Sequence, residues 1–374
     1  MKTPLAYFRD LAASTAIALE AHGLAGHEHV VWLQGFAPGC IYVALGRPVT
    51  AWFHPVSPLR RRPRMLSRYL ALLGRLARRP LPVPRPLDLR DPGRLARWLV
   101  DRSRRGRAVC VTAYASSAVR VAVAAGEAGL RLDGTCFITL GEPFTDAKRR
   151  AVEAAGARAL VRYAFTEAGI IGYGCGRPAV SDDLHFLRDS YALVQTPRAV
   201  VEGGPEVDAF RFTSLLPSAP KILLNVESGD YGLLEERACG CPLEAVGLTH
   251  HLARIRSFEK LTGEGMTFVR SGLLDILEDV LPARFGGTSA DYQVLEEETE
   301  LGIFRLRLLV SPAEGPVDEE AIRETFLGEL GKGAAATIWR HAGTVEVQRR
   351  PPVATPAGKI LPFQLLRAGS GPRP

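Results

Sequence analysis

Cysteine, lysine and long uncharged runs are all scarce in this sequence. Six of the 374 residues are cysteine, too few for a disulfide framework, so we expect a reduced, cytoplasmic protein. The longest uncharged early stretch, residues 30–46, contains Gln34, Pro38 and several glycines and therefore predicts no membrane-spanning helix. Internal repeats and low-complexity tracts are also missing, and with an ordinary globular composition this excludes disordered and collagen-like classes.

The charge is unevenly distributed along the chain. Basic minus acidic residues gives 47 − 40 = +7, yet residues 1–150 carry 24 basic and 10 acidic side chains (+14) and residues 151–374 carry 23 and 30 (−7). Only six of the 47 cations are lysines, and the arginines are not interleaved with aromatic residues on a repeating face. We therefore expect neither a nucleic-acid partner nor a membrane partner.

The basic excess is densest over residues 60–79, which hold eight arginines. Their spacing with apolar residues predicts an amphipathic surface helix whose arginines face solvent, and a face that binds phosphate or acidic groups is the alternative. The proline-dense residues 80–93 predict an extended connector.

Strand and helix patterns alternate from residue 108 onward. Ser116 and Ser117 are expected to cap the first helix of this region. The alternation predicts an α/β fold, with a large domain of parallel or mixed sheets covered by helices. The expected elements are strands over residues 109–114, 136–142 and 159–167, and helices over 118–130 and 145–157.

A more strand-rich pattern follows, and the chain turns acidic after Arg256. A strand over residues 221–227 leads into an expected turn at 228–232. Beyond Arg256 we expect a smaller C-terminal α+β domain, so the predicted domains are residues 1–256 and 257–374. The expected elements of this C-terminal domain are helices over 271–281 and 318–333 and strands over 291–298, 304–311 and 344–350.

Residues that could bind a ligand or a metal ion follow two of the predicted parallel strands. In such sheets ligands bind beyond the carboxyl ends of the strands, which makes Gly141 and Glu142 candidates. After the next strand, the ring of Tyr163 could stack on a purine, and Thr166 with Glu167 could hold Mg²⁺ against phosphate oxygens. The alternative for this second group is ordinary turn chemistry.

A third candidate lies between the glycines at 229 and 232. Asp230 could accept hydrogen bonds from both hydroxyls of a ribose. A β-turn in which this aspartate caps its own backbone is the alternative.

Four residues form a candidate metal site: Cys175, His185, Cys239 and Cys241. Three thiols and an imidazole are the ligand set of a closed structural zinc site. The spacing matches no zinc-finger pattern, and buried free cysteines are the alternative. The remaining cysteines, Cys40, Cys110 and Cys136, lie in apolar runs and are predicted core residues, whereas His250 and His251 are predicted surface residues.

The order of these motifs resembles the adenylate-forming (AMP-dependent acyl/aryl ligase) superfamily, and within it the phenylacetate–CoA ligase-like branch. Tyr-x-x-Thr-Glu, a later Gly-Asp turn, an arginine-rich hinge and a C-terminal Gly-Lys occur in sequence. The segments that carry the likeness are residues 141–175, 254–268 and 352–363. It is clear over residues 105–374 and loose over residues 1–104.

The resemblance implies an enzyme that joins a carboxylic acid to a thiol, with ATP, Mg²⁺ and coenzyme A as cofactors. It implies an acyl- or aryl-adenylate intermediate and then a thioester. It also implies the following roles: Tyr163 along adenine, Gly141 and Glu142 as a wall beside the adenylate, Asp230 and Arg256 on the ribose, Thr166 on the α-phosphate, Glu167 on Mg²⁺, Lys359 on the carboxylate and α-phosphate, and Glu259 as the hinge. Members of the branch often have a Cys, a His and a Cys-x-Cys at places that match Cys175, His185, Cys239 and Cys241, which implies structural zinc.

Two departures from the family leave alternatives open. Relatives carry a Ser/Thr/Gly-rich loop that grips the β- and γ-phosphates, and residues 1–374 contain none. We expect either a start placed too far downstream or loss of that part, and a chain that binds adenylate better than it exchanges pyrophosphate. The hinge has Phe258 before Glu259 where many relatives have two acids.

The alternatives in function are transfer to a carrier-protein thiol or a protein side chain, and a degenerate nucleotide- or acyl-binding protein without full turnover. The expected partners are a carboxylic acid, ATP, and coenzyme A or a carrier thiol, and a homodimer is left open. The sequence does not name the acid.

Overall fold

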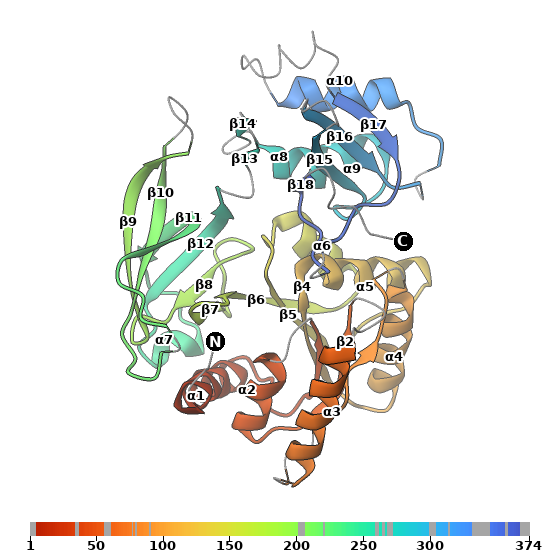
Figure 1. Ribbon diagram of the computed structural model, residues 1–374. Helices are drawn as coiled ribbons and strands as arrows, with labels where there is room; N and C mark the ends of the chain where they lie inside the picture. The colour runs from red at the N-terminus through yellow and green to blue at the C-terminus, as the bar shows by residue number, and fades with distance from the viewer. Residues whose placement is uncertain are drawn as a thin grey trace.

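The computed structural model describes residues 5–33, 37–55, 61–76, 78, 81–89, 91–200, 206–219, 221–258, 262–263, 266–267, 272–298, 304–312, 315–330, 345–355 and 358–366. Within these residues the strands form a 12-stranded sheet, a four-stranded sheet and a two-stranded ribbon. Glu259, the predicted hinge residue, lies outside the described residues. The mixed α/β architecture with a large and a small sheet confirms the predicted fold class (Figure 1).

One half of the large sheet is parallel, in the order β3-β2-β1-β4-β5-β6. Strand β4 is buried along its whole length because helices cover both faces of this half, as its unbroken apolar pattern predicts. The strands are β1 Glu28–Trp32, β2 Val49–His54, β3 Arg85–Pro86, β4 Val109–Tyr114, β5 Thr135–Leu140 and β6 Arg158–Phe165. The helices are α1 Leu5–Ala21, α2 Ala37–Leu45, α3 Arg61–Leu76, α4 Pro92–Arg104, α5 Ala115–Glu127 and α6 Asp146–Ala154.

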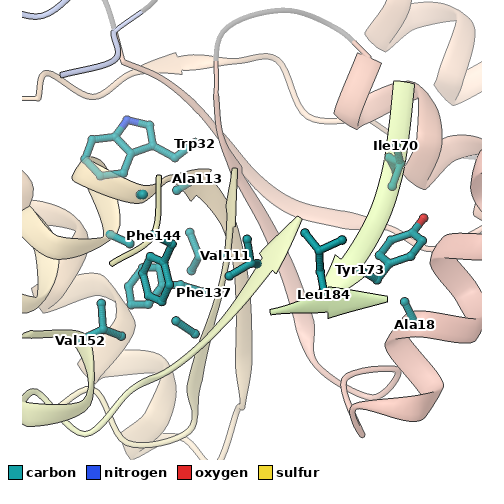
Figure 2. Close-up of a cluster of buried hydrophobic side chains, with 14 of the residues drawn as sticks. Ala18, Trp32, Val111, Ala113, Phe137, Phe144, Val152, Ile170, Tyr173 and Leu184 are labelled. Atoms are coloured by element: carbon teal, nitrogen blue, oxygen red, sulfur yellow. The ribbon is translucent and has the colours of Figure 1, made fainter. Parts of the chain in front are cut away.

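The core beneath α5 and α6 is one layer of large side chains against the sheet. Figure 2 shows Phe144 and Val152 gathered against Phe137 and Val111 of neighbouring strands. Helix α5 begins directly after β4, with Tyr114 as its N-cap residue, so the predicted capping by Ser116 and Ser117 is wrong. The helix starts earlier than expected, and Ser116 donates its hydroxyl to Glu142 instead.

The other half of the large sheet is antiparallel, in the order β6-β7-β8-β12-β11-β10-β9. The predicted strand over 221–227 and turn over 228–232 are wrong, because β11 begins at Val226 and runs straight through Asp230. A Cβ on Gly232 would lie 2.7 Å from the carbonyl oxygen of Ala253, so this glycine permits close strand packing rather than a turn. The bounds are β7 Gly169–Gly174, β8 Leu184–Phe186, β9 Tyr191–Ala199, β10 Glu206–Ser214, β11 Val226–Glu236, α7 Pro242–Ala245 and β12 His250–Ser257.

The four-stranded sheet, in the order β17-β16-β15-β18, has its own apolar core, to which Leu277, Leu308 and Phe326 belong. The expected strands and helices beyond residue 271 are all present in part or in full. Their bounds are α8 Leu273–Asp275, a π-helical segment Ile276–Val280, α9 Leu281–Phe285, β15 Tyr292–Glu298, β16 Phe304–Val310, α10 Glu319–Glu329, β17 Val345–Arg349 and β18 Phe363–Leu366. The ribbon consists of β13 Thr262–Gly263 and β14 Met266–Thr267.

The small sheet lies on the α6 side of the large one, with the chain before β18 descending toward α5 and α6 (Figure 1). A buried ion pair joins the two parts: the Nζ of Lys148, on α6, lies 2.8 Å from the Oε1 of Glu278 in the π-helical segment.

The arginine-rich stretch forms the predicted surface helix α3, and Arg68 and Arg75 are exposed. No helix in the described ranges combines the length and the apolar character needed to cross a bilayer.

Candidate functional site

A cavity of about 610 Å³ opens at the carboxyl ends of the parallel strands. It is lined by residues from β4, β5, β6, β11 and β12 and by the segment before β18. The predicted nucleotide-site residues all line this one cavity: Gly141, Glu142, Tyr163, Thr166, Glu167, Asp230, Arg256 and Lys359. Residues spread over more than half of the chain are thus brought together.

Tyr163 and Asp230 meet across the cavity. The phenol of Tyr163 donates a hydrogen bond of 2.7 Å to Oδ2 of Asp230. Burial, and then the Asp230 charge, raise the pKa of Tyr163 well above its usual value, so the phenol stays protonated and donates. The carboxylate of Asp230 therefore faces the cavity as an acceptor.

Arg256 is held by an aspartate that the sequence did not single out. Its Nη1 lies 2.7 Å from Oδ2 of Asp182, whose Oδ1 accepts a 2.9 Å hydrogen bond from the backbone N–H of Arg254. Asp182 is almost completely buried and lines the cavity itself. The only signal for it in the sequence is the pair of adjacent acids at 182–183, which by itself is typical of a solvated loop.

Glu142 lines the cavity, and its carboxylate caps helix α5. Its carboxylate accepts hydrogen bonds from the backbone N–H of Ser116 at 2.7 Å, the hydroxyl of Ser116 at 2.8 Å and the N–H of Ile360 at 3.0 Å. Burial raises the pKa of Glu142, while Lys148 and these donors act in the opposite direction. Glu142 thus ties β5, α5 and the segment of Lys359 together.

Lys359 reaches the cavity from a tight turn before β18. The N–H of Thr355 donates to the carbonyl of Lys359 at 2.7 Å, and the N–H of Lys359 donates to Oγ1 of Thr355 at 3.1 Å. The ammonium lies 5.4 Å from the ring centroid of Tyr114. A Cβ on Gly141 would approach this ammonium to 3.0 Å, and Gly141 has a φ of +80°, so glycine leaves room for the cation.

Thr166 and Glu167 lie at the exposed rim of the same cavity. The carboxylate of Glu167 is 3.8 Å from the ammonium of Lys221. A hydroxyl and a carboxylate are oxygen ligands of the kind that Mg²⁺ takes.

The four predicted metal ligands converge at the far end of the antiparallel half. The sulfur of each cysteine and a ring nitrogen of His185 all lie within 4.8 Å of one another. Nε2 of His185 is 3.0 Å from the sulfur of Cys241 and 3.7 Å from that of Cys239. Nδ1 of His185 lies 2.6 Å from the carbonyl oxygen of Leu248, which fixes the tautomer and aims Nε2 at the thiols.

The four candidate metal ligands differ in their protonation preferences, and burial raises the pKa of Cys175 and that of Cys239. Burial lowers the pKa of His185 to about 4, so the ring is neutral and its Nε2 can be a ligand. Burial acts to raise the pKa of Cys241, but hydrogen bonds from three backbone N–H groups outweigh it and lower that pKa. The residue types and their convergence fit Zn²⁺.

His251 is completely buried, so its prediction as a surface residue is wrong. Strand β12 is paired on both sides, and His251 is in register with His185, with ring centroids 4.2 Å apart. Nδ1 of His251 lies 2.8 Å from Oδ1 of Asp183, which also pairs with Arg237. Cys110 and Cys136 are buried as predicted, and Cys40 is partly buried.

The fold of this chain is similar to that of solved structures, although its sequence has no family match. No protein-family model matches the sequence, and the search of curated proteins found no match. The crystal structure of the anthranilate CoA ligase AuaEII in complex with anthranoyl-AMP is similar at a TM-score of 0.53 and 15% identity, covering 94% of this chain. The chain has the adenylate-forming ligase fold.

The chain spans 60% of the length of AuaEII. Two further structures are similar over 94% of the chain: an acyl-CoA synthetase of Brucella canis (14% identity, 59% of that chain, TM-score 0.41) and a variant of E. coli MenE with bound OSB-AMS (12%, 62%, TM-score 0.49). The likeness to AuaEII, at 15% identity, shows the fold alone.

Proposed function

We propose that this protein is an ATP-dependent carboxylate ligase that forms an acyl- or aryl-adenylate and passes the acyl group to the thiol of coenzyme A. The observation that carries the proposal is the convergence of Tyr163, Asp230, Arg256 and Lys359 on one cavity, although they belong to distant parts of the chain. The adenylate-forming ligase fold supports the same reaction class.

In the first half-reaction a carboxylate oxygen attacks the α-phosphorus of ATP, and pyrophosphate leaves with the electrons of the broken P–O bond. Lys359 steadies the carboxylate and the α-phosphate, because charge neutralisation matters more here than proton transfer. Asp230 accepts hydrogen bonds from the ribose hydroxyls, and Tyr163 lies along the adenine. Thr166 would contact the α-phosphate and Glu167 would hold Mg²⁺, which would supply further charge neutralisation.

In the second half-reaction the thiol attacks the acyl carbonyl, AMP leaves, and the thiol proton passes to solvent. We propose that residues 257–374 act as a mobile domain that turns about Glu259 between the two steps. Lys359 belongs to that domain and Gly141 to the other, so rotation would withdraw the ammonium from the cavity. A carrier-protein thiol is the alternative acceptor, and release of AMP on adding one thiol or the other separates them.

The test replaces Lys359 and follows the two half-reactions separately. Lys359→Ala is expected to reduce adenylate formation from acid and ATP by at least about 100-fold, while thioester formation from a supplied adenylate is largely spared. Asp230→Asn is expected to weaken binding of AMP analogues, and Arg105→Ala, an exposed cation elsewhere, is the control. Equal losses of both steps in Lys359→Ala would contradict the assigned role.

A nucleotide-binding protein without turnover is the second candidate function. It is favoured by the lack of a Ser/Thr/Gly-rich phosphate loop in residues 1–374. Tight binding of an adenylate analogue together with no thioester formation from a supplied adenylate would select it.

A further inference from the structure

Arg162 is a buried cation that the proposed reaction does not use. It belongs to β6, is 5% exposed and lines the cavity, as Thr112 and Ile170 also do. Its guanidinium lies over the ring of Tyr173, 5.3 Å from the centroid. Among the residues that the structure describes, it forms no ion pair, and its Nε is buried without a hydrogen-bond partner.

The other arginine of the cavity differs in this respect. Arg256 pairs with Asp182 at 2.7 Å, so its charge is compensated within the protein. A buried cation without a counter-ion is costly, and proteins usually pair such groups or use them to bind an anion. The thiol of Cys110 and the phenols of Tyr42 and Tyr173 interact electrostatically with Arg162. Burial raises the pKa of each, so these groups stay protonated and supply no negative charge.

The register of the parallel strands aligns Arg162 with Tyr114, the residue that Lys359 contacts. Tyr114 pairs with Leu140, and Leu140 pairs with Arg162, so the three residues form one row on the same face of neighbouring parallel strands. Lys359 holds its ammonium over Tyr114 at one end of this row. The backbones of Tyr114 and Arg162 are two strand spacings, roughly 10 Å, apart.

Helices α1 and α2 contribute a mostly apolar part of the cavity wall. Tyr7, Phe8 and Leu11 of α1 line the cavity together with Ile41 of α2. A carboxylate beside Lys359, an apolar body along this wall and a second anion beside Arg162 would together complement the row.

We propose that Arg162 binds a second acidic group of the substrate, so that the acid is a small dicarboxylic acid with an apolar body. The inference rests on the proposed function, because the reacting carboxylate is the one placed by Lys359. Arg162 is then a specificity-determining residue, and the distal carboxylate replaces the counter-ion that the described part of the chain does not provide.

The test compares two non-hydrolysable acyl-sulfamoyl adenosines that differ only at the distal end. One carries octanedioic acid with its free terminal carboxylate, and the other carries its terminal methyl ester. Calorimetry on the full chain is expected to give about 10- to 100-fold tighter binding of the free acid, the range typical of hydrogen bonds to charged groups. Arg162→Met is expected to remove this preference, and Arg162→Lys to retain part of it.

Arg158→Met is the matched control, because Arg158 belongs to the same strand but is exposed and does not line the cavity. It is expected to keep the full preference. Arg162→Met is also expected to keep or raise the melting temperature, since an unpaired buried charge is removed.

Three results would overturn the proposal. Equal binding of both analogues by the wild type refutes the distal carboxylate while leaving the proposed function intact. A preference that survives in Arg162→Met, with a lowered melting temperature, shows that Arg162 only stacks on Tyr173 for stability. Binding of neither analogue, nor of AMP, refutes the proposed function and this inference with it.

Discussion

At the scale of the single residue, His29 shows how burial sets a protonation state. It lies on β1, is 2% exposed, and neither ring nitrogen has a hydrogen-bond partner among the described residues. The ring of Tyr42 packs against it at 4.8 Å between centroids. Burial, and then the charge of Arg47, lower its pKa to about 4 from the ordinary 6.5.

This shift predicts a loss of stability in acid. The unfolded chain binds a proton as the pH falls below 6.5, whereas folded His29 resists protonation until about pH 4, so the free energy of unfolding falls across that window. The loss from His29 alone is about 2 kcal/mol between neutral pH and about pH 5. His29→Leu is expected to reduce the pH dependence by this amount in guanidinium chloride unfolding.

Tyr42→Phe is the control for the His29 experiment, because it alters the same packing without removing the imidazole. An unchanged difference between neutral and acid unfolding free energies in His29→Leu would show that other buried groups carry the acid sensitivity.

At the scale of the element, regular structure was largely predictable and contacts between elements were not. Strands β4, β5 and β6 are apolar runs between helical patterns, and local sequence is enough to identify them. Whether Ser116 caps a helix depends on Glu142, and whether Gly232 forms a turn depends on Ala253. These partners are distant in sequence, so local patterns could not decide either case.

The same limit applies to the candidate site. Alternation along β6 places Arg162 opposite Tyr163, but no local pattern reveals that the described part of the chain offers it no carboxylate. The motif residues, by contrast, were identified in advance through their order along the chain. Their roles remain predictions, and only their convergence on one cavity is a structural finding.

The candidate metal site is expected to link three parts of the antiparallel half of the large sheet through one metal ion. Cys175 follows β7, His185 lies on β8, and Cys239 and Cys241 precede α7. We predict about one zinc per chain in purified protein, because four protein ligands complete the coordination of one structural zinc ion. Cys241→Ser is expected to lower both zinc content and melting temperature, because the binding energy of a structural metal is folding energy.

Cys40→Ser is the control for this substitution, since Cys40 lies outside the cluster and is partly buried. Elemental analysis and a melting curve on each variant provide the measurement. Purified wild type without zinc, or Cys241→Ser with the zinc content and melting curve of the wild type, would contradict the zinc hypothesis.

At the scale of the whole molecule, the cavity is assembled from both sheets. Lys359 and Ile360 come from the segment before β18, while Gly141 and Glu142 directly follow β5 of the large sheet. The N–H of Ile360 donates to Glu142 at 3.0 Å. The buried pair of Lys148 and Glu278 holds the same two parts together beside the site. Movement of one part against the other would break both contacts, which couples the position of Lys359 to the packing of α6.

This assembly predicts which ligands the chain prefers. Tyr163, Asp230 and Lys359 line the cavity, and under the proposed function they would contact a purine, a ribose and an α-phosphate. Residues 1–374 contain no Ser/Thr/Gly-rich loop whose N–H groups would grip the β- and γ-phosphates. We therefore expect the chain to bind an acyl-adenylate analogue at least about 100-fold more tightly than ATP, because missing phosphate donors typically cost several kcal/mol. Competition calorimetry measures the ratio, with AMP as the reference ligand. Comparable affinities for ATP and the analogue, together with rapid ATP–pyrophosphate exchange, would show that another basic segment, such as α3 with its exposed Arg68 and Arg75, holds the terminal phosphates.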